Sequence, residues 1–232
     1  MTERTQRLLR AIITEYIQNP HPIGSHVIVE KYLKDVSSAT IRNDMARLEE
    51  QGFIEQPHTS AGRVPTIKAY EYYVANFLSQ PELDKAEQQK LRRVLAQHHG
   101  EAAQLIRELA KAVADVSLSA VFVGFSPRDA YYTGLSNLFR QPEFSEIDLV
   151  QNFSEIVDHL DEVMEDLFPR VTDRVEILLG KHNPFGTTCG ALVTKYTLGK
   201  NQNGMFGILG PIRMPYDRHR ALLEYTCSLL HK

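Results

Sequence analysis

The sequence predicts an α+β protein, with helices in its N-terminal part and then an antiparallel sheet flanked by helices. Two observations predict this class. Apolar residues recur at helical spacing through residues 1–50, whereas short apolar runs typical of buried strands dominate after residue 119. The Asn203-Gly204 pair between two such runs is typical of a hairpin, which makes the pairing antiparallel.

Length and composition indicate a globular protein. A chain of 232 residues with 43% hydrophobic residues can fill one large core or two ordinary ones. No run approaches the roughly 18 apolar residues of a membrane span, and the N-terminus lacks the apolar centre of a secretion signal, so we expect a cytoplasmic protein without membrane contact. Cys189 and Cys227 are too few for a disulfide framework and lack metal-site spacing, which predicts reduced, mostly buried thiols. We expect no metal site and no cofactor.

A continuous apolar stripe predicts the first helix. Thr2 can serve as its N-cap, and the segment NPHPIG (19–24) ends it. A second helix is expected after Ser25, and because it is short it must be stabilised by packing. The apolar positions of the two helices are Leu8, Leu9, Ile12, Ile13, Tyr16 and Ile17, then Val27, Ile28, Val29, Tyr32 and Leu33.

A third helix begins at Ser37 or Ser38, both good N-caps, and ends at Gly52. Ile41, Met45 and Leu48 recur at i, i+4 and i+7, so this side of the helix must face the core.

A short strand (53–55), a turn-rich loop PHTSAGRVP (57–65) and another helix after Thr66 complete the N-terminal part. The last helix carries Tyr70, Tyr73, Val74 and Phe77. Helices followed by a flexible hairpin predict a winged helix-turn-helix for residues 1–80.

Residues 81–118 are charged and alanine-rich, and their apolar positions follow a 4-3-4-3 spacing typical of a helix packed along one seam. Two interpretations stay open: a helix or helix pair packed on its own domain, or a seam between two copies of the chain. The seam positions are Leu91, Leu95, His98, Ala102, Leu105, Leu109, Ala112 and Val116.

The remaining residues, 119–232, alternate strands and helices. Long amphipathic helices are expected over 147–168 and at the C-terminus. Strands are expected at 120–125, 175–180, 191–198 and 205–210, with a turn at 201–204.

The polar flanks of the third helix carry side chains suited to DNA. At 100° per residue, Thr40, Asn43 and Arg47 fall on one flank, and Ala39 and Arg42 on the other. Small leading residues let a helix enter the major groove, while Arg42 can donate two bonds to guanine and Asn43 can pair with adenine.

The following loop extends this surface. The net charge of −3 argues against nucleic acid over the whole protein, but no carboxylate occurs between Gln56 and Tyr70, and Gly62 permits close backbone approach. The start of the third helix suits a phosphate. The candidate DNA-binding residues are Ser37, Ser38, Ala39, Thr40, Arg42, Asn43, Arg47, His58, Thr59, Ser60, Gly62, Arg63 and Lys68. A winged helix used only for protein contacts is the alternative.

An enzyme is not expected. Cys189, His182 and Asp173 could form a nucleophile, a base and an orienting group, but they lie in no nucleophile-elbow or protease-like context. The neighbouring His98 and His99 diverge by 100° on a helix and cannot share a metal ion.

The segment SSATIRNDMARLEEQGFIEQPHTSAGRVPT (37–66), followed by AYEYYV, resembles the winged-helix region of the heat-inducible transcription repressors, the HrcA family. Weaker resemblances continue in the family's order to the C-terminus. They are YYTGLSNLFRQPEF (131–144), ILLGKHNP (177–184) and GILGPIRMPYDRHRALLEY (207–225).

The resemblance implies a homodimeric repressor that binds double-stranded DNA at an inverted-repeat operator, called CIRCE, upstream of chaperone genes. It also implies that the GroEL chaperonin keeps the repressor active. The expected domains are a winged-helix DNA-binding domain (1–80), a linker or dimerisation helix region (81–118) and a reduced GAF-like regulatory or dimerisation domain (119–232).

The chain departs from the family between residues 125 and 131. Only SPRDA separates AVFVGF from YYTGLSNL, where relatives carry further strands and an inserted subdomain that contributes to dimerisation. Two other functions stay open. One is a ligand-responsive regulator with a GAF-like sensor, because a GAF-like sheet commonly offers a cavity; the other is a module that docks a chaperone.

Overall fold

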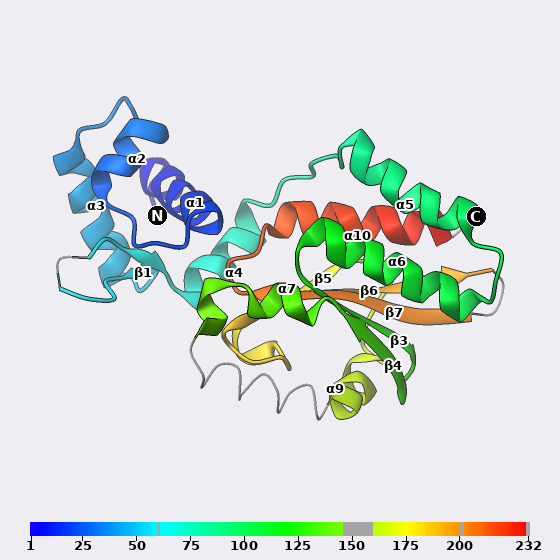
Figure 1. Ribbon diagram of the computed structural model, residues 1–232. Helices are drawn as coiled ribbons and strands as arrows, with labels where there is room; N and C mark the ends of the chain where they lie inside the picture. Colours follow the sequence, from blue (N-terminus) through cyan, green and yellow to red (C-terminus); the bar gives the residue numbers. More distant parts are fainter. Residues whose placement is uncertain (60, 146–159, 200–201, 231–232) are drawn as a thin grey trace. The chain divides into compact units, whose positions relative to one another are not determined.

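The computed structural model describes residues 1–59, 61–145, 160–199 and 202–230 (Figure 1). The chain divides into two compact units, an N-terminal unit (Met1–Leu78) and a C-terminal unit (Ser79–Lys232). No helix in the described ranges is long and apolar enough to cross a membrane.

The N-terminal unit contains the predicted helices and a short hairpin. Its elements are α1 (Glu3–Gln18), α2 (Ser25–Lys31), α3 (Ser38–Glu50), β1 (Ile54–Glu55), β2 (Val64–Pro65) and α4 (Ile67–Asn76). The predicted N-caps are confirmed for α1 and α3, since the Thr2 and Ser37 hydroxyls accept from the backbone N–H groups of Thr5 and Thr40. Gly52 follows α3 at a φ of +73°, which glycine adopts without strain.

One apolar core joins these helices. Leu8, Leu9, Ile12 and Ile13 of α1 are completely buried, as are Ile28 of α2 and Ile41 of α3. The predicted apolar stripe of α1 therefore points into the core, and it is covered by the helices that follow it.

A buried carboxylate links α1 to α2. Glu15 is 4% exposed and accepts from Lys31 Nζ at 2.8 Å, Tyr32 Oη at 2.9 Å and Asn19 Nδ2 at 2.9 Å. The lysine bond first, and then the tyrosine and asparagine bonds, lower the pKa of Glu15 despite its burial. Burial and the same carboxylate raise the pKa of Tyr32 to about 12.

The C-terminal unit is built on an antiparallel sheet, which confirms the α+β class. Within the described residues the sheet has five strands in the order β4-β3-β7-β6-β5, and every neighbouring pair is antiparallel. The strands are β3 (Ala120–Ser126), β4 (Asp129–Thr133), β5 (Glu176–Leu178), β6 (Cys189–Leu198) and β7 (Gln202–Pro211). The other elements are α5 (Lys85–Gln97), α6 (Ala102–Ser117), α7 (Leu135–Phe139), η1 (Pro142–Ser145), α9 (Leu160–Leu167), η2 (Gly180–His182) and α10 (Tyr216–Leu230).

Helices cover both faces of the sheet (Figure 1). Alternate residues of each strand point to opposite faces. Phe122, Val193 and Met205 face a cluster that includes Leu138 of α7 and Met164 of α9, whereas α6 and α10 pack on the other face. Both faces are therefore apolar, as the near-continuous apolar runs of β6 and β7 predict.

A close contact joins the central strand β7 to its neighbour β3. A Cβ atom at Gly207 would lie 2.1 Å from the Phe122 ring, so the ring occupies the space above this glycine. Phe122 and Gly207 are register partners, so the ring lies directly beside position 207. Only a residue without a side chain fits there.

The hairpin between β6 and β7 is confirmed, but its turn is shifted from the predicted position. Asn203 and Gly204 lie within β7, opposite Thr197 and Tyr196, and the strands connect at residues 199–201, of which only Gly199 is described. The glycine serves packing here, because a Cβ at Gly204 would lie 2.3 Å from the Tyr196 ring. The predicted strand 175–180 is also shorter, and β4 was not predicted.

Residues 81–118 form a helix pair, α5 and α6, interrupted at residues 98–101. Both helices contact α10, which agrees with the intramolecular packing alternative; a seam between two copies stays a prediction. Of the helix expected over 147–168, α9 is described, whereas residues 146–159 lie outside the described ranges.

We predict that Glu15→Gln lowers the free energy of unfolding by about 1–3 kcal/mol at neutral pH, because Lys31 loses its charged partner. Since folding lowers the pKa of Glu15, its contribution is complete above the unfolded value of about 4.3 and is lost as pH falls through the folded value. Urea unfolding from pH 7 to pH 3 should show the two proteins converging in acid. The exposed Glu30→Gln is the control, and a constant difference down to pH 3 would contradict the prediction.

Candidate nucleic-acid interface

Helix α3 has one buried side and one exposed side. Ile41, Met45 and Leu48 are 0%, 5% and 1% exposed, so the predicted core side is confirmed. Of the candidate DNA-binding residues on this helix, Ala39, Arg42, Asn43 and Arg47 are exposed, and Ser38 and Thr40 are half-buried; Ser37 at its N-cap is exposed. The free first-turn N–H groups and the helix dipole make this exposed end attractive for anions.

A hydroxyl pair connects the starts of α2 and α3. Ser25 Oγ lies 2.9 Å from Ser38 Oγ, and Arg42 Nε donates to Ser25 Oγ at 3.3 Å. The Arg42 guanidinium therefore contacts the N-terminal unit through a hydrogen bond from its Nε atom. The sequence indicates Ser25 only as a helix start, because its contact with Arg42 depends on how α2 packs against α3.

Asp44 forms the buried ionic contact of α3. It is 1% exposed and accepts from Arg4 Nε at 2.6 Å and Arg4 Nη2 at 3.1 Å, while Arg47 Nη1 lies 3.8 Å away. The hydrogen bond to Asp44 and its charge raise the pKa of Arg4. Sequence reasoning missed Asp44, although its spacing from Ile41 and Leu48 places an acid on the core side, where it needs a partner.

The loop after β1 is held against the segment before α2. Ile23 and Arg63 form an isolated antiparallel bridge, with both N–H···O distances at 2.9 Å. A Cβ atom at Gly62 would lie 2.5 Å from the Ile23 backbone, so close approach at this glycine serves an internal contact. The bridge places residues 61–63 beside the start of α2.

Two of the basic candidates have partners inside the unit. Arg63 Nε and Nη2 lie 3.0 Å and 2.8 Å from Glu49 Oε2, and the arginine side chain is 22% exposed. Lys68 Nζ donates to the Gln51 carbonyl at 2.7 Å and lies 4.7 Å from the centre of the Phe53 ring. His58 and Thr59 are exposed, and Ser60 lies outside the described residues.

A hollow of about 540 Å³ lies between these segments. Its lining contains the Arg42 and Arg63 side chains and no carboxylate, which suits an anionic ligand. The lining residues are Pro22, Ile23, Gly24, Ser25, His26, Arg42, Met45, Ala61, Gly62 and Arg63.

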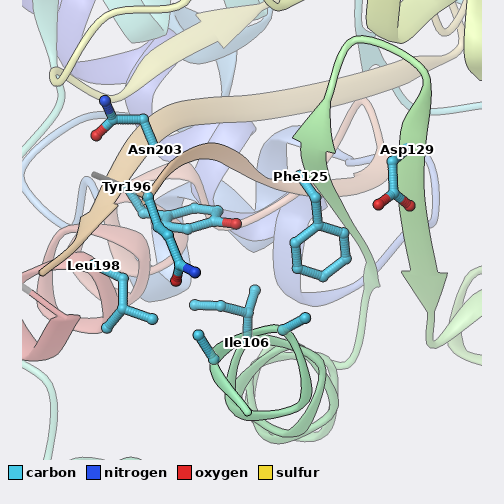
Figure 2. Close-up of a pocket in the computed structure, with 9 residues that line it drawn as sticks. Ile106, Phe125, Asp129, Tyr196, Leu198 and Asn203 are labelled. Carbon is cyan, nitrogen blue, oxygen red and sulfur yellow. The ribbon is translucent and has the colours of Figure 1, made fainter. Parts of the chain in front are cut away.

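A second cavity, of about 300 Å³, lies in the C-terminal unit between the first turn of α6 and the ends of the strands (Figure 2). Ile106 borders it from the helix, Phe125 and Asp129 from β3 and β4, and Tyr196 and Asn203 from β6 and β7. Burial, with a smaller effect of the Asp129 charge, raises the pKa of Tyr196, so its phenol stays protonated.

The two cysteines of the chain are both buried. Burial raises the pKa of Cys189 to about 11 and that of Cys227 to about 12, so both thiols stay protonated. His98 Nδ1 lies 3.2 Å from Glu108 Oε2, and no group of His, Cys, Asp and Glu suited to a metal occurs among the described residues.

Comparison with known proteins gives a consistent result. A family model described as the HrcA protein C terminal domain matches residues 38–219. The heat-inducible transcription repressor HrcA of Brevibacillus brevis is 26% identical over 100% of this chain and 97% of its own length, and that of Carboxydothermus hydrogenoformans is 24% identical over 98% and 96%. The HrcA of Pelotomaculum thermopropionicum is 50% identical over 93 residues, which cover 40% of this chain and 27% of the relative.

The relatives are longer than this chain. The alignment with the Brevibacillus brevis protein spans 333 positions, so that protein contains residues without a counterpart among the 232 residues here. A crystal structure of a hypothetical protein at 2.2 Å resolution has the same fold, with a TM-score of 0.81 and 20% identity over 99% of this chain and 97% of that one.

We predict that Gly62→Ala lowers the free energy of unfolding by about 1–3 kcal/mol, because the new methyl group collides with the Ile23 backbone and breaks the bridge. Urea unfolding measures the loss. Gly52→Asn is the matched control, since its position has open space and asparagine tolerates positive φ, so it should cost less than 1 kcal/mol. Equal stability of Gly62→Ala and the unchanged protein would show that the bridge contributes nothing.

Proposed function

The chain belongs to the HrcA family of heat-inducible transcription repressors, which are not enzymes, and we propose that its N-terminal unit is a winged helix-turn-helix that binds operator DNA. In this proposal α3 is the recognition helix and the loop between β1 and β2 is the wing. Repression follows from occupying the promoter, and the protein acts in the cytoplasm.

The exposed side of α3 is the observation that supports this function best. Arg42 and Asn43 stand on the solvent side of a helix whose opposite side is buried. Arginine pairs bidentately with guanine in the major groove, and asparagine with adenine. Ala39 and Thr40 are small enough to let the start of the helix approach the bases.

Phosphate contacts are assigned to the residues around this helix. At the start of the helix these are the Ser37 and Ser38 hydroxyls, and on its side Arg47. From the wing they are His58, Thr59, Ser60 and Gly62. The Glu49 bond makes Arg63 a support for the wing, and Lys68 likewise holds the end of α3 through the Gln51 carbonyl.

The operator is proposed to be an inverted repeat of the CIRCE type, bound by a homodimer. A twofold axis in the protein places two recognition helices on two arms of a palindrome. The family membership supports modulation by GroEL. Footprinting of the region upstream of the chain's own gene, with and without GroEL, tests both points: two symmetric protected arms are expected, more strongly occupied with the chaperonin present.

We predict that Arg42→Ala weakens binding to the operator by about 1–3 kcal/mol and relaxes base preference, because one guanine contact is lost. Fluorescence anisotropy with the footprinted duplex and a shuffled duplex measures both effects. Arg10→Ala, an exposed arginine of α1, is the control. Equal losses on operator and shuffled DNA would contradict base reading by Arg42.

We predict that Arg47→Ala reduces the slope of log K against log salt by about 1, as expected for one lost phosphate contact. Arg63→Ala should change this slope less, because its guanidinium already donates to Glu49. Binding titrations at several salt concentrations compare the two variants. A larger slope change for Arg63→Ala would assign the phosphate contact to the wing arginine instead.

The cavity in Figure 2 favours a second candidate function, a regulator that responds to a small ligand. Its wall combines apolar side chains with the Asp129 carboxylate, the Tyr196 phenol and the Asn203 amide, which suits a small polar molecule. A thermal-shift screen of metabolites tests this function. A compound that raises Tm in the unchanged protein but not in Tyr196→Phe would support it.

A further inference from the structure

Ser25 occupies an unusual place between the two helices. It is the first residue of α2, it is 8% exposed, and its hydroxyl is within hydrogen-bond distance of two groups of α3. One of these groups, Ser38, is the first residue of α3, and the other, Arg42, follows it by one helical turn on the same side. A serine oxygen has one hydrogen and two lone pairs, so it can accept from Arg42 and still pair with Ser38.

This contact restricts the Arg42 guanidinium. Its Nε–H group is directed to Ser25 Oγ at 3.3 Å, and no described residue accepts from its Nη1 or Nη2 groups. A guanidinium can offer two kinds of fork, one formed by Nε with an Nη group and one formed by the two Nη groups. With Nε engaged, the fork of the two Nη groups is the one left for a planar pair of acceptors.

We propose that Ser25 is a positioning residue for sequence recognition: it holds the Arg42 guanidinium so that its two Nη groups face the O6 and N7 atoms of a guanine in the major groove. This inference rests on the proposed DNA-binding function and adds a residue that does not touch the base. Ser38 completes the arrangement, because its hydroxyl fixes the orientation of the Ser25 hydroxyl from the start of α3.

The expected effect follows from side-chain freedom. Without Ser25, Arg42 must be immobilised when DNA binds, and ordering one long side chain costs roughly 0.5–1.5 kcal/mol, equivalent to about a 2- to 13-fold loss of affinity. Ser25→Ala should therefore weaken binding of the full chain to the footprinted operator by about 2- to 13-fold. Binding to a shuffled duplex should change by less than about 2-fold, since phosphate contacts do not need this orientation.

A double-mutant cycle separates positioning from a structural role. In the Arg42→Ala background, Ser25→Ala should cause no further loss on operator DNA, because there is no guanidinium left to hold. Ser25→Thr keeps the hydroxyl and should retain discrimination. Ser228→Ala, which removes a serine hydroxyl from α10 in the other unit, is the matched control and should bind as the unchanged protein does.

A measurement on the unchanged protein covers the case in which Ser25→Ala does not fold. Proton NMR of the full chain without DNA should show slower solvent exchange for the Arg42 Nε–H group than for that of exposed Arg10. Equal exchange rates would overturn the inference.

The outcomes of the binding experiments are distinguishable. If the unchanged protein does not prefer the operator to shuffled DNA, the proposed function fails and the inference fails with it. If the unchanged protein prefers the operator and Arg42→Ala loses that preference, but Ser25→Ala keeps it, the inference alone is overturned. The inference is also overturned if Ser25→Ala weakens operator binding as strongly in the Arg42→Ala background as it does in the otherwise unchanged protein.

Discussion

The burial of one side of α3 is the constraint on which the N-terminal unit depends. Ile41, Met45 and Leu48 are almost inaccessible, and burying side chains of this kind stabilises a protein by about 1.5–3 kcal/mol each. The helix therefore cannot turn about its axis without exposing them, and this fixes the direction of its polar side. Asp44 adds a sharper constraint, since a buried carboxylate must keep its bonds to Arg4.

Features set by neighbouring residues were predictable from the sequence, and features set by packing were not. The N-cap of α3 and its apolar spacing are local, so they predicted the helix and its buried side. The Glu49–Arg63 ion pair and the Ser25–Arg42 bond join segments whose approach depends on tertiary packing. The Asn203-Gly204 pair carries a strong turn signal, but the Tyr196 ring needs the space above Gly204, and the turn forms elsewhere. DNA contact itself stays a prediction.

The C-terminal unit has a five-stranded antiparallel sheet among its described residues, in a chain shorter than its relatives. Strands β3 and β4 follow each other directly and pair along the whole of β4, with an irregularity on β3 between Gly124 and Ser126. The additional residues of the relatives are therefore not needed to order the described strands. Two apolar faces, covered by α6 and α10 on one side and by α7 and α9 on the other, provide the stability of this unit.

The packing of Phe122 on Gly207 has an evolutionary consequence. The aromatic ring fills the volume that any side chain at position 207 would require, so neither residue can change size alone without a collision or a void. Substitutions that persist here should therefore arise as compensating pairs, a smaller residue on β3 accompanied by a larger one on β7. Paired exchanges of this kind among relatives would indicate that β3 and β7 keep the same register in those proteins.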